Sequence, residues 1–163
     1  MEFWDILDET GKKIYRAPVK PPMSLKPGEY HLTVHVWVKN DKGEFLIQRR
    51  ADSREILPGV WAATTGSALS GETSANAAVR ELYEELGVKA VPEQLKFKKR
   101  FLRETSIADL WVMQANIPLT RLVLQREEVA QAKWVDAKEL RFMLAQGVFF
   151  DYGKEYFDVV FGL

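Results

Sequence analysis

Residues 66–88 read GSALSGETSANAAVRELYEELGV, and this stretch is the most informative part of the chain. It fits the pattern G-x5-E-x7-R-E-U-x-E-E-x-G-U, in which U is a bulky aliphatic residue. On a helix of about 100° per residue, Glu84 and Glu85 fall within about 60° on either side of Glu81. The spacing therefore predicts a helix that gathers carboxylates on one side. An adjacent apolar arc fits burial against a core, and it consists of Ala75, Ala78, Val79, Leu82 and Leu86.

Both ends of this helix carry residue types that terminate helices. The Thr73 side chain is suited to accept a hydrogen bond from a free N–H group of the first turn. Gly87 is suited to the left-handed conformation that ends a helix, with Val88 beyond it. We therefore expect the helix to lie between Thr73 and Gly87.

Three carboxylates this close together repel one another, and each like-charged helical pair costs about 0.2–0.5 kcal/mol. Arg80 can neutralise Glu84 one turn away, but Glu81 and Glu85 remain. A divalent cation is the obvious compensation, and clustered carboxylates are hard oxygen ligands that suit Mg²⁺ or Mn²⁺. The alternative is an acidic helix face in water. The glycines and the glutamate at fixed spacings around the helix favour a metal-binding cluster.

The composition is that of a globular protein, and we expect a single domain over residues 1–163. Of the 163 residues, 47% are hydrophobic and 28% are charged, and Lys+Arg equal Asp+Glu at 23 each. This balance gives no sign of a nucleic-acid or membrane partner. Neither a membrane span nor a secretory signal is expected. The absence of cysteine excludes disulfides, thiolate catalysis and cysteine-based zinc sites, and it fits a cytoplasmic location.

The segments before residue 66 read as strands and turns. Residues 3–17 predict a hairpin with Thr10-Gly11 in the turn, and the proline-rich residues 18–28 predict an irregular connection packed on the same domain. Residues 30–39 alternate between two faces, and a turn leads to a second strand over 45–50. One face of 30–39 consists of Tyr30, Leu32, Val34, Val36 and Val38, and the other of His31, Thr33, His35 and Trp37.

The remaining segments predict further strands and helices around the same core. After a loop over 51–60, we expect a short strand over 61–65, strands over roughly 95–104 and 107–117, and a short strand over 133–135. A helix near 137–146 and an aromatic tail, 149–163, follow. The order strands, helix, strands, helix indicates an α+β protein, an α/β/α sandwich around a mixed β-sheet.

The pattern over residues 66–88 resembles the signature box of the Nudix hydrolase family, with no departure from it. The resemblance implies the same sandwich fold, and substrates in which a nucleoside diphosphate is linked to another group. It implies that Arg80 orients a glutamate and that Glu72 is structural. The implied reaction is metal-assisted attack of water on phosphorus. The implied metal ligands are Glu81, Glu84, Glu85 and the backbone carbonyl of Gly66.

The resemblance also bears on the general base. Glu84 or Glu85 is the default candidate. Many family members carry an acidic residue in the loop that here holds Glu127 and Glu128, ahead of a similar Trp-Val strand. Glu128 is therefore a further candidate catalytic residue, and the alternative is an ordinary exposed loop carboxylate.

A second resemblance covers roughly the first half of the chain. His31-x5-Trp37, the LIQRR of residues 46–50 and the LPGVW of residues 57–61 are similar to the isopentenyl diphosphate isomerase branch of the superfamily. Those isomerases protonate an alkene with the help of a cysteine and hold a metal with several histidines. Here Thr65 stands at the expected cysteine position and Ser67 at the expected histidine. We therefore expect an isomerase-like scaffold with hydrolase chemistry. Isomerisation of isopentenyl diphosphate, and a ligand-sensing module without turnover, are the alternatives.

Several residues outside the box are candidates for contact with a small diphosphate substrate. Arg49, Arg50 and Arg54 could meet phosphates, or they could form salt bridges within their own loop. His31 could contact the substrate, although a hydrogen-bonded structural role is favoured for both histidines. Core positions are favoured for Trp61 and Trp111 over stacking on a base. The basic run 96–100 is expected to be a solvated strand face, and specificity is expected in loops 18–28, 51–60 and 119–129.

The aromatic tail has two interpretations. Left in water, residues 149–161 would form an apolar patch of the kind that marks interfaces. We expect the tail to pack onto the sheet of its own chain. The alternative is a homodimer contact, because symmetric dimers are the commonest oligomers.

Overall fold

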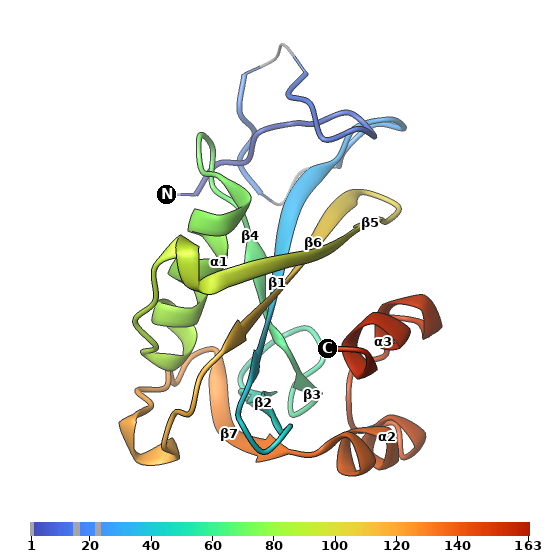
Figure 1. Cartoon of the computed structure of the whole chain (residues 1–163). Coiled ribbons are helices and arrows are strands. Elements are labelled where there is room, and N and C mark those ends of the chain that lie inside the picture. The colour runs from blue at the N-terminus through green and yellow to red at the C-terminus, as the bar shows by residue number, and fades with distance from the viewer. Residues whose placement is uncertain (1, 15–16, 22–23) are drawn as a thin grey trace.

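The computed structural model describes residues 2–14, 17–21 and 24–163. Within these residues, seven strands form one mixed sheet, flanked by three α-helices and two short 3₁₀ helices (Figure 1). The elements in chain order are β1 (His31–Lys39), β2 (Phe45–Arg50), β3 (Trp61–Ala62), β4 (Thr64–Ser67), α1 (Ser74–Leu86), η1 (Pro92–Gln94), β5 (Leu95–Leu102), β6 (Ser106–Gln114), η2 (Leu119–Arg121), β7 (Val129–Val135), α2 (Ala137–Ala145) and α3 (Lys154–Phe161).

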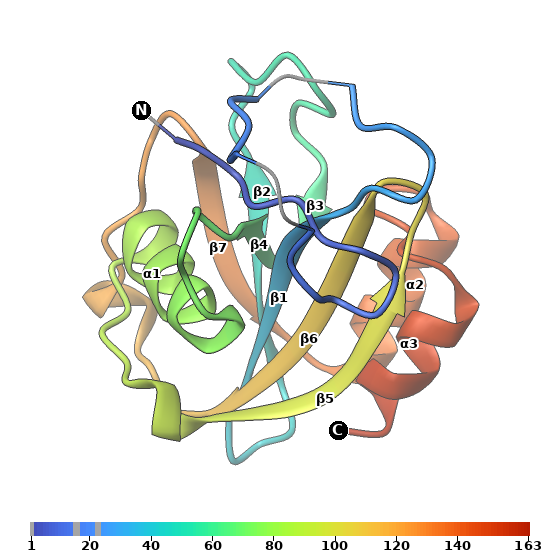
Figure 2. The ribbon, with the colours of Figure 1, turned by 90° about the horizontal axis from the view of Figure 1, so that it is seen from above.

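The sheet has the order β3-β2-β1-β6-β5, with β4 added on β1 and β7 added on β2. Strands β1 and β6 run parallel, and the other paired strands run antiparallel, so the sheet is mixed. Helix α1 covers one face, and α2 and α3 lie on the opposite side (Figure 2). The predicted α+β sandwich around a mixed sheet is therefore confirmed.

Strand β1 separates two apolar clusters, as its alternating sequence predicts. Val34, Val36 and Val38 pack with the apolar side of α1, and all three are buried. On the other face, Trp37 packs with residues of α2 and α3. The tail therefore forms a helix on the sheet of its own chain, as expected, with Tyr156, Phe157 and Val160 buried. Association into a homodimer stays a prediction.

Helix α1 has the two caps that the sequence predicts. The Thr73 side chain accepts a hydrogen bond from the N–H of Asn76 at 3.2 Å. Gly87 ends the helix in the left-handed region with φ of 69°. A Cβ at Gly87 would lie 2.7 Å from the Val123 Cβ, so a larger residue has no room there. The backbone N–H of Val123 donates to the Leu86 carbonyl, which helps to fix the end of the helix.

Several strands differ from the sequence expectation in their bounds. Strand β7 begins at Val129 rather than at residue 133, because its backbone pairs with β2 along the whole stretch. The predicted short strand over 61–65 is two strands with a break at Ala63. The break arises because Ala62 pairs with β2, whereas Thr64 and Thr65 pair with β1. Strands β5 and β6 also end earlier, at Leu102 and Gln114.

The N-terminal segment packs on the loop that precedes α1. The Asp5 carboxylate accepts hydrogen bonds from the Ser70 hydroxyl at 2.7 Å and from the Gly71 N–H at 2.9 Å. The predicted turn at Gly11 is present, with its N–H donating to the Asp8 carbonyl, but the predicted strands are reduced to isolated bridges such as Leu7 with Lys13. These contacts support the proposal that residues 1–28 belong to the same domain. Tyr15 and Arg16 of the predicted hairpin lie outside the described residues.

No helix in the described ranges is both long enough and apolar enough to span a bilayer.

Three polar side chains, Tyr156 of α3 and His35 and Trp37 of β1, form a buried hydrogen-bonded cluster. The Tyr156 hydroxyl accepts a hydrogen bond from the Trp37 Nε1–H at 2.8 Å, and it lies 2.8 Å from the His35 Nδ1. Since the indole nitrogen can only donate, the hydroxyl hydrogen of Tyr156 is available for His35 Nδ1. His35 is then a neutral imidazole with its proton on Nε2. Its pKa is lowered to about 3, chiefly by burial and also by the Arg103 charge. The hydrogen-bonded structural role expected for His35 is confirmed.

The depressed pKa of His35 predicts a pH dependence of stability. Between its unfolded pKa near 6.5 and its folded pKa near 3, the unfolded chain binds a proton that the folded chain does not. The stabilisation is thus present above pH 6.5 and is lost as the pH falls, at up to about 1.4 kcal/mol per pH unit. His35→Gln keeps an acceptor for Tyr156 but does not titrate. We expect urea unfolding to show a smaller loss of stability between about pH 7.5 and about pH 5 in this variant. Equal losses in the variant and the wild type would contradict the assignment.

Candidate active site

The side chain of Arg80 lies at the centre of the box. Its guanidinium donates to Glu72 at 2.8 and 3.1 Å, to Glu81 at 2.8 Å and to Glu84 at 3.0 Å. It also donates to the Ser67 carbonyl at 2.9 Å, so it joins α1 to the end of β4. Burial alone would lower the pKa of Arg80, but Glu72 and Glu81 raise it above the usual value. Arg80 is therefore a fixed cation within the cluster.

Glu72 closes the loop between β4 and α1. One of its carboxylate oxygens accepts from the Leu69 N–H at 2.9 Å, and both oxygens accept from Arg80. The Glu72 N–H donates back to the Leu69 carbonyl at 2.9 Å. These bonds place Glu72 as the part of the loop that holds Arg80 in position.

The Glu81 side chain lies directly against Gly66. A Cβ built on Gly66 would lie 2.0 Å from the Glu81 carboxyl carbon, so no side chain fits there. Gly66 has no positive φ, which means that lack of space, rather than backbone conformation, requires the glycine. Burial raises the pKa of Glu81 to about 7, against the lowering effect of Arg80.

Glu85 is held by residues of the sheet. The Gln48 side-chain amide donates to the Glu85 carboxylate at 2.5 Å and to the Thr64 hydroxyl at 3.0 Å. Burial raises the pKa of Glu85 to about 8; the Gln48 hydrogen bond lowers it, and the charges of Glu81 and Glu128 raise it further. Gln48 and Thr64 were not among the residues predicted for the site. An available signal was the polar Gln48 within the otherwise apolar start of β2.

The charge pattern of the cluster differs from the sequence expectation in one respect. Arg80 was expected to neutralise Glu84 alone, but it also bonds Glu81, because its guanidinium reaches both carboxylates from one nitrogen. In the described part of the chain, no three Asp, Glu or His side chains are arranged to hold a metal ion as they stand. The donors are nonetheless all oxygens, and two of them belong to Glu81, which is buried, and Glu85, which is half-buried, with the pKa of both raised chiefly by burial. This donor chemistry fits Mg²⁺ or Mn²⁺.

The loop candidates outside the box are engaged with one another. The Arg54 guanidinium donates to the Glu128 carboxylate at 2.5 Å, and the Ala51 N–H donates to the Glu128 carbonyl at 2.9 Å. Arg49 pairs with Asp52 at 2.9 Å, which is one of the salt bridges that were alternatives to phosphate contact.

The Arg50 Nε donates to the Ile56 carbonyl at 3.1 Å, and its charge lowers the pKa of Glu85. The structure thus brings Arg50 and Glu128 within electrostatic range of Glu85.

His31 has a different environment from the one expected. Its ring stacks on Trp4, with ring centroids 3.9 Å apart and planes 6° apart. The His31 Nδ1 and the Trp4 Nε1 are buried, and neither has a hydrogen-bond partner among the described residues. The hydrogen-bonded role predicted for His31 is therefore wrong within the part of the chain that the structure describes. The contact depends on packing of the N-terminal segment, and no local sequence signal could have identified it.

The two tryptophans named as candidate stacking residues lie in or beside the core. Trp111 packs with the cluster under α1, and its Nε1–H donates to the Ser74 hydroxyl at 2.9 Å. Trp61 packs with the cluster under α2 and α3, and Lys133 lies 4.7 Å from its ring centroid. Both side chains are half-buried and pack against the core, so the core positions favoured from the sequence are confirmed in part.

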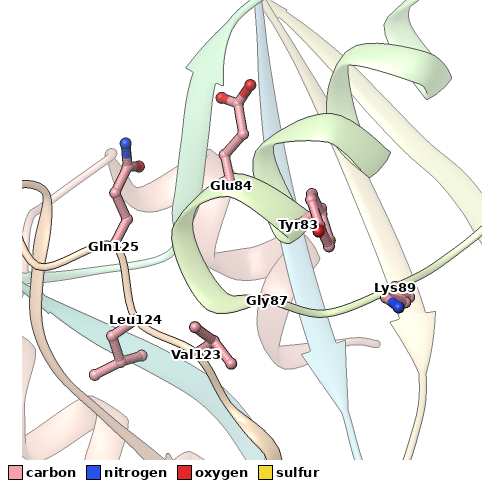
Figure 3. A pocket seen from close by; sticks show the side chains of 7 residues that line it. All are labelled: Tyr83, Glu84, Gly87, Lys89, Val123, Leu124 and Gln125. Carbon is pink, nitrogen blue, oxygen red and sulfur yellow. The ribbon is translucent and has the colours of Figure 1, made fainter.

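A cavity of about 400 Å³ adjoins the C-terminal end of α1 (Figure 3). It lies between α1 and the segment that follows η2, and Glu84 is on its rim, with its side chain directed away from Val123 and Leu124. The other lining residues are Tyr83, Gly87, Lys89 and Gln125. The cavity places the loop 119–129 beside one of the box carboxylates.

The chain is similar to known proteins over most of its length. The chain is 40% identical over 157 residues to a protein named as an uncharacterized Nudix hydrolase from Listeria monocytogenes, and the match covers 93% of this chain and 90% of the relative. It is 36% identical over 131 residues to an isopentenyl-diphosphate Delta-isomerase from Dinoroseobacter shibae, covering 76% of this chain and 73% of the relative.

The fold itself is similar to that of a solved structure. The crystal structure of DR0079 from Deinococcus radiodurans superposes with a TM-score of 0.74 at 18% identity, covering 91% of each chain. A family model described as NUDIX domain matches residues 29–153, which is most of the chain and includes the whole box. The protein therefore belongs to the Nudix family.

Proposed function

We propose that the protein is a Mg²⁺- or Mn²⁺-dependent hydrolase that cleaves a diphosphate linkage, in a nucleoside diphosphate derivative, by attack of water on phosphorus. The observation that carries the proposal is the carboxylate pair of Glu81, which is buried, and Glu85, which is half-buried; burial is the main cause that raises the pKa of both, and Arg80 is bonded to Glu81. A cluster that is short of positive charge suits a divalent ion with its phosphate ligands. The match to the family supports the same reaction class.

The metal would be held by Glu81, Glu84, Glu85 and the backbone carbonyl of Gly66. When bound, such an ion lowers the pKa of a water molecule and neutralises charge on phosphate oxygens. Arg80 supports this role by fixing the orientation of Glu81 and Glu84 through its hydrogen bonds. Because Gly66 has no side chain, the Glu81 carboxylate can lie against the backbone of β4.

Glu84 or Glu85 would accept the proton of the attacking water. Glu128 is the remaining candidate, because its carboxylate acts on Glu85 and is anchored by Arg54. A general base needs a position within hydrogen-bond reach of the water, and all three lie on elements that meet around the box.

Substrate contacts are proposed for residues and loops around this centre. Arg50 is the best placed of the arginines, since its charge reaches Glu85, and Arg49 and His31 are further candidates. Loops 51–60 and 119–129 meet through the pair of Arg54 and Glu128. Specificity for the group beyond the diphosphate is therefore proposed to reside in these loops. The substrate is a small molecule rather than a nucleic acid, and the proposed location is the cytoplasm.

Isomerisation of isopentenyl diphosphate is the second candidate, because one relative at 36% identity carries the name of that enzyme. The sequence disfavours isomerisation, because Thr65 stands at the position expected for cysteine and Ser67 at the position expected for histidine. The chain has no cysteine. Incubation with isopentenyl diphosphate and Mg²⁺ tests it directly, and formation of the allylic isomer would overturn the hydrolase proposal.

A substrate panel tests the proposed activity. The protein is incubated with nucleoside diphosphate sugars, dinucleoside polyphosphates and nucleoside triphosphates, with Mg²⁺, with Mn²⁺ or with a chelator. We expect metal-dependent release of phosphate or nucleotide from at least one substrate. Stabilisation by these ligands without any product would instead indicate a ligand-sensing module.

Amide substitutions in the box should remove turnover but keep the fold. Glu84→Gln or Glu85→Gln removes a ligand charge and should lower kcat by about 100-fold or more. The fold should persist because the amide of Glu85→Gln still offers an oxygen to Gln48, and because it removes the cost of a buried charge. Glu93→Gln, an exposed position on η1, is the matched control and should retain activity. Near-normal rates in both box variants at saturating Mg²⁺ would show that the assigned roles are wrong.

Substitution of Gly66 should weaken metal binding through Glu81. In Gly66→Ala the new methyl group would lie 2.0 Å from the Glu81 carboxyl carbon, so the carboxylate must move. We expect Mn²⁺ affinity, measured by titration calorimetry, to fall about 10-fold or more. Ser67→Ala in the same strand leaves the backbone carbonyl that binds Arg80 and should bind Mn²⁺ as the wild type does. Unchanged Mn²⁺ affinity in Gly66→Ala would refute the placement of Glu81 in the metal site.

A further inference from the structure

Tyr152 is carried by a short segment that is fixed against the edge of the sheet. The Trp61 N–H donates to the Val148 carbonyl at 2.9 Å, and the Phe150 N–H donates back to the Trp61 carbonyl at 2.8 Å. An Arg103 side-chain N–H donates to the Tyr152 carbonyl at 2.8 Å. These bonds set the position of the Tyr152 backbone before its side chain makes any contact.

The ring of Tyr152 is held from several sides. It packs edge-on against His35, with centroids 4.9 Å apart, and it contacts Tyr156 at 4.6 Å and Phe150 at 4.7 Å. Its hydroxyl oxygen accepts a hydrogen bond from the Ala63 N–H at 3.3 Å. The hydroxyl is therefore located at the break between β3 and β4.

The two neighbouring tyrosines differ in how their hydroxyl groups are used. Each hydroxyl has one hydrogen to donate and two lone pairs to accept with. The Tyr156 hydroxyl accepts from Trp37 and has His35 Nδ1 as its acceptor, so its hydrogen is used. The Tyr152 hydroxyl accepts from Ala63, but its hydrogen has no acceptor among the residues that the structure describes. The Tyr152 O–H is therefore free, within the described residues, to donate a hydrogen bond to a ligand.

The Tyr152 hydroxyl lies at Ala63, three residues before Gly66, the first residue of the box. Thr64, the residue after Ala63, has a hydroxyl that accepts from Gln48, which also donates to Glu85. Burial chiefly raises the pKa of Tyr152, the Glu85 carboxylate raises it further, and Ala63 and Arg50 lower it. The phenol therefore keeps its hydrogen at neutral pH. It also lies within electrostatic range of the carboxylate and the arginine that the proposed function assigns to the site.

We propose that Tyr152 is a substrate-binding residue that the aromatic tail contributes to the active site, and that its hydroxyl donates a hydrogen bond to an oxygen of the bound diphosphate. The inference rests on the proposed function for the identity of the ligand. Phosphate oxygens are strong acceptors that bring negative charge, and the half-buried Tyr152 hydroxyl, whose hydrogen has no acceptor among the described residues, is suited to bind one. The tail then serves the site as well as the core.

Tyr152→Phe tests the proposal because it removes the hydroxyl and keeps the ring contacts. The probe is methylenediphosphonate, a diphosphate analogue that cannot be hydrolysed, titrated into the intact protein with Mg²⁺ by calorimetry. We expect its binding to weaken about 10- to 100-fold in Tyr152→Phe, the range for loss of a hydrogen bond to a charged group. With a substrate from the panel, kcat/KM should fall by a similar factor.

Tyr156→Phe is the matched control. It removes a phenol oxygen from the same aromatic cluster, but this oxygen is already bonded to Trp37 and His35. It should lower the unfolding temperature while leaving methylenediphosphonate affinity unchanged. A merely structural role for Tyr152 would give the same result in both variants.

Each outcome decides the matter. Unchanged affinity and unchanged kcat/KM in Tyr152→Phe would overturn the proposal, and so would a failure of that variant to fold, since the hydroxyl would then be structural. If the wild type binds the analogue but hydrolyses nothing in the panel, the hydrolase proposal fails while the binding comparison still tests Tyr152. If the wild type does not bind the analogue, the role of Tyr152 in diphosphate binding is refuted.

Discussion

The guanidinium of Arg80 is the interaction on which the site depends. It bonds two box carboxylates, the loop glutamate Glu72 and the last carbonyl of β4, so one side chain fixes helix, loop and strand together. A buried carboxylate such as Glu81 is costly without a counter-charge, and Arg80 supplies that charge when no metal is bound. Lysine could not replace it, because the planar fork provides several donors in fixed directions. Arg80 therefore holds helix, loop and strand in place, whereas the carboxylates of the described residues are not arranged around a metal ion as they stand.

The two faces of the sheet carry different parts of the structure around the box. On the α1 face, Gly66 of β4 lies against the Glu81 carboxylate, and Thr64 of β4 is linked to Glu85 through the Gln48 amide. On the opposite face, α3 packs its aromatic residues on β1. The two sides meet at Ala63, where the chain passes from pairing with β2 to pairing with β1 and its N–H is left for Tyr152. The break between β3 and β4 thus lets the C-terminal segment bond to the backbone at Ala63.

Local signals in the sequence predicted much of this structure. Helix α1 and its caps were predictable because Thr73, Gly87 and the apolar spacing act within one helix, and β1 was predictable from its alternation. The placement of Glu72 and Arg80 followed from the family pattern. The polar Gln48 in β2 was a signal in the sequence, but its bond to Glu85 was not predictable, because it depends on how α1 packs on the sheet. The start of β7 and the stacking of Trp4 on His31 were missed for the same reason, since backbone pairing and segment docking leave no local signature.

The central claim is that water attacks phosphorus at the carboxylate cluster held by Arg80. Hydrolysis in water enriched in ¹⁸O, with a substrate found active in the panel and Mg²⁺ present, tests it most directly. The account predicts that mass spectrometry finds the heavy oxygen in a phosphate group of one product. Heavy oxygen found instead in the alcohol product would place the cleavage at carbon. An isomerised diphosphate without heavy oxygen would show that the chemistry is isomerisation, and either result would contradict the account.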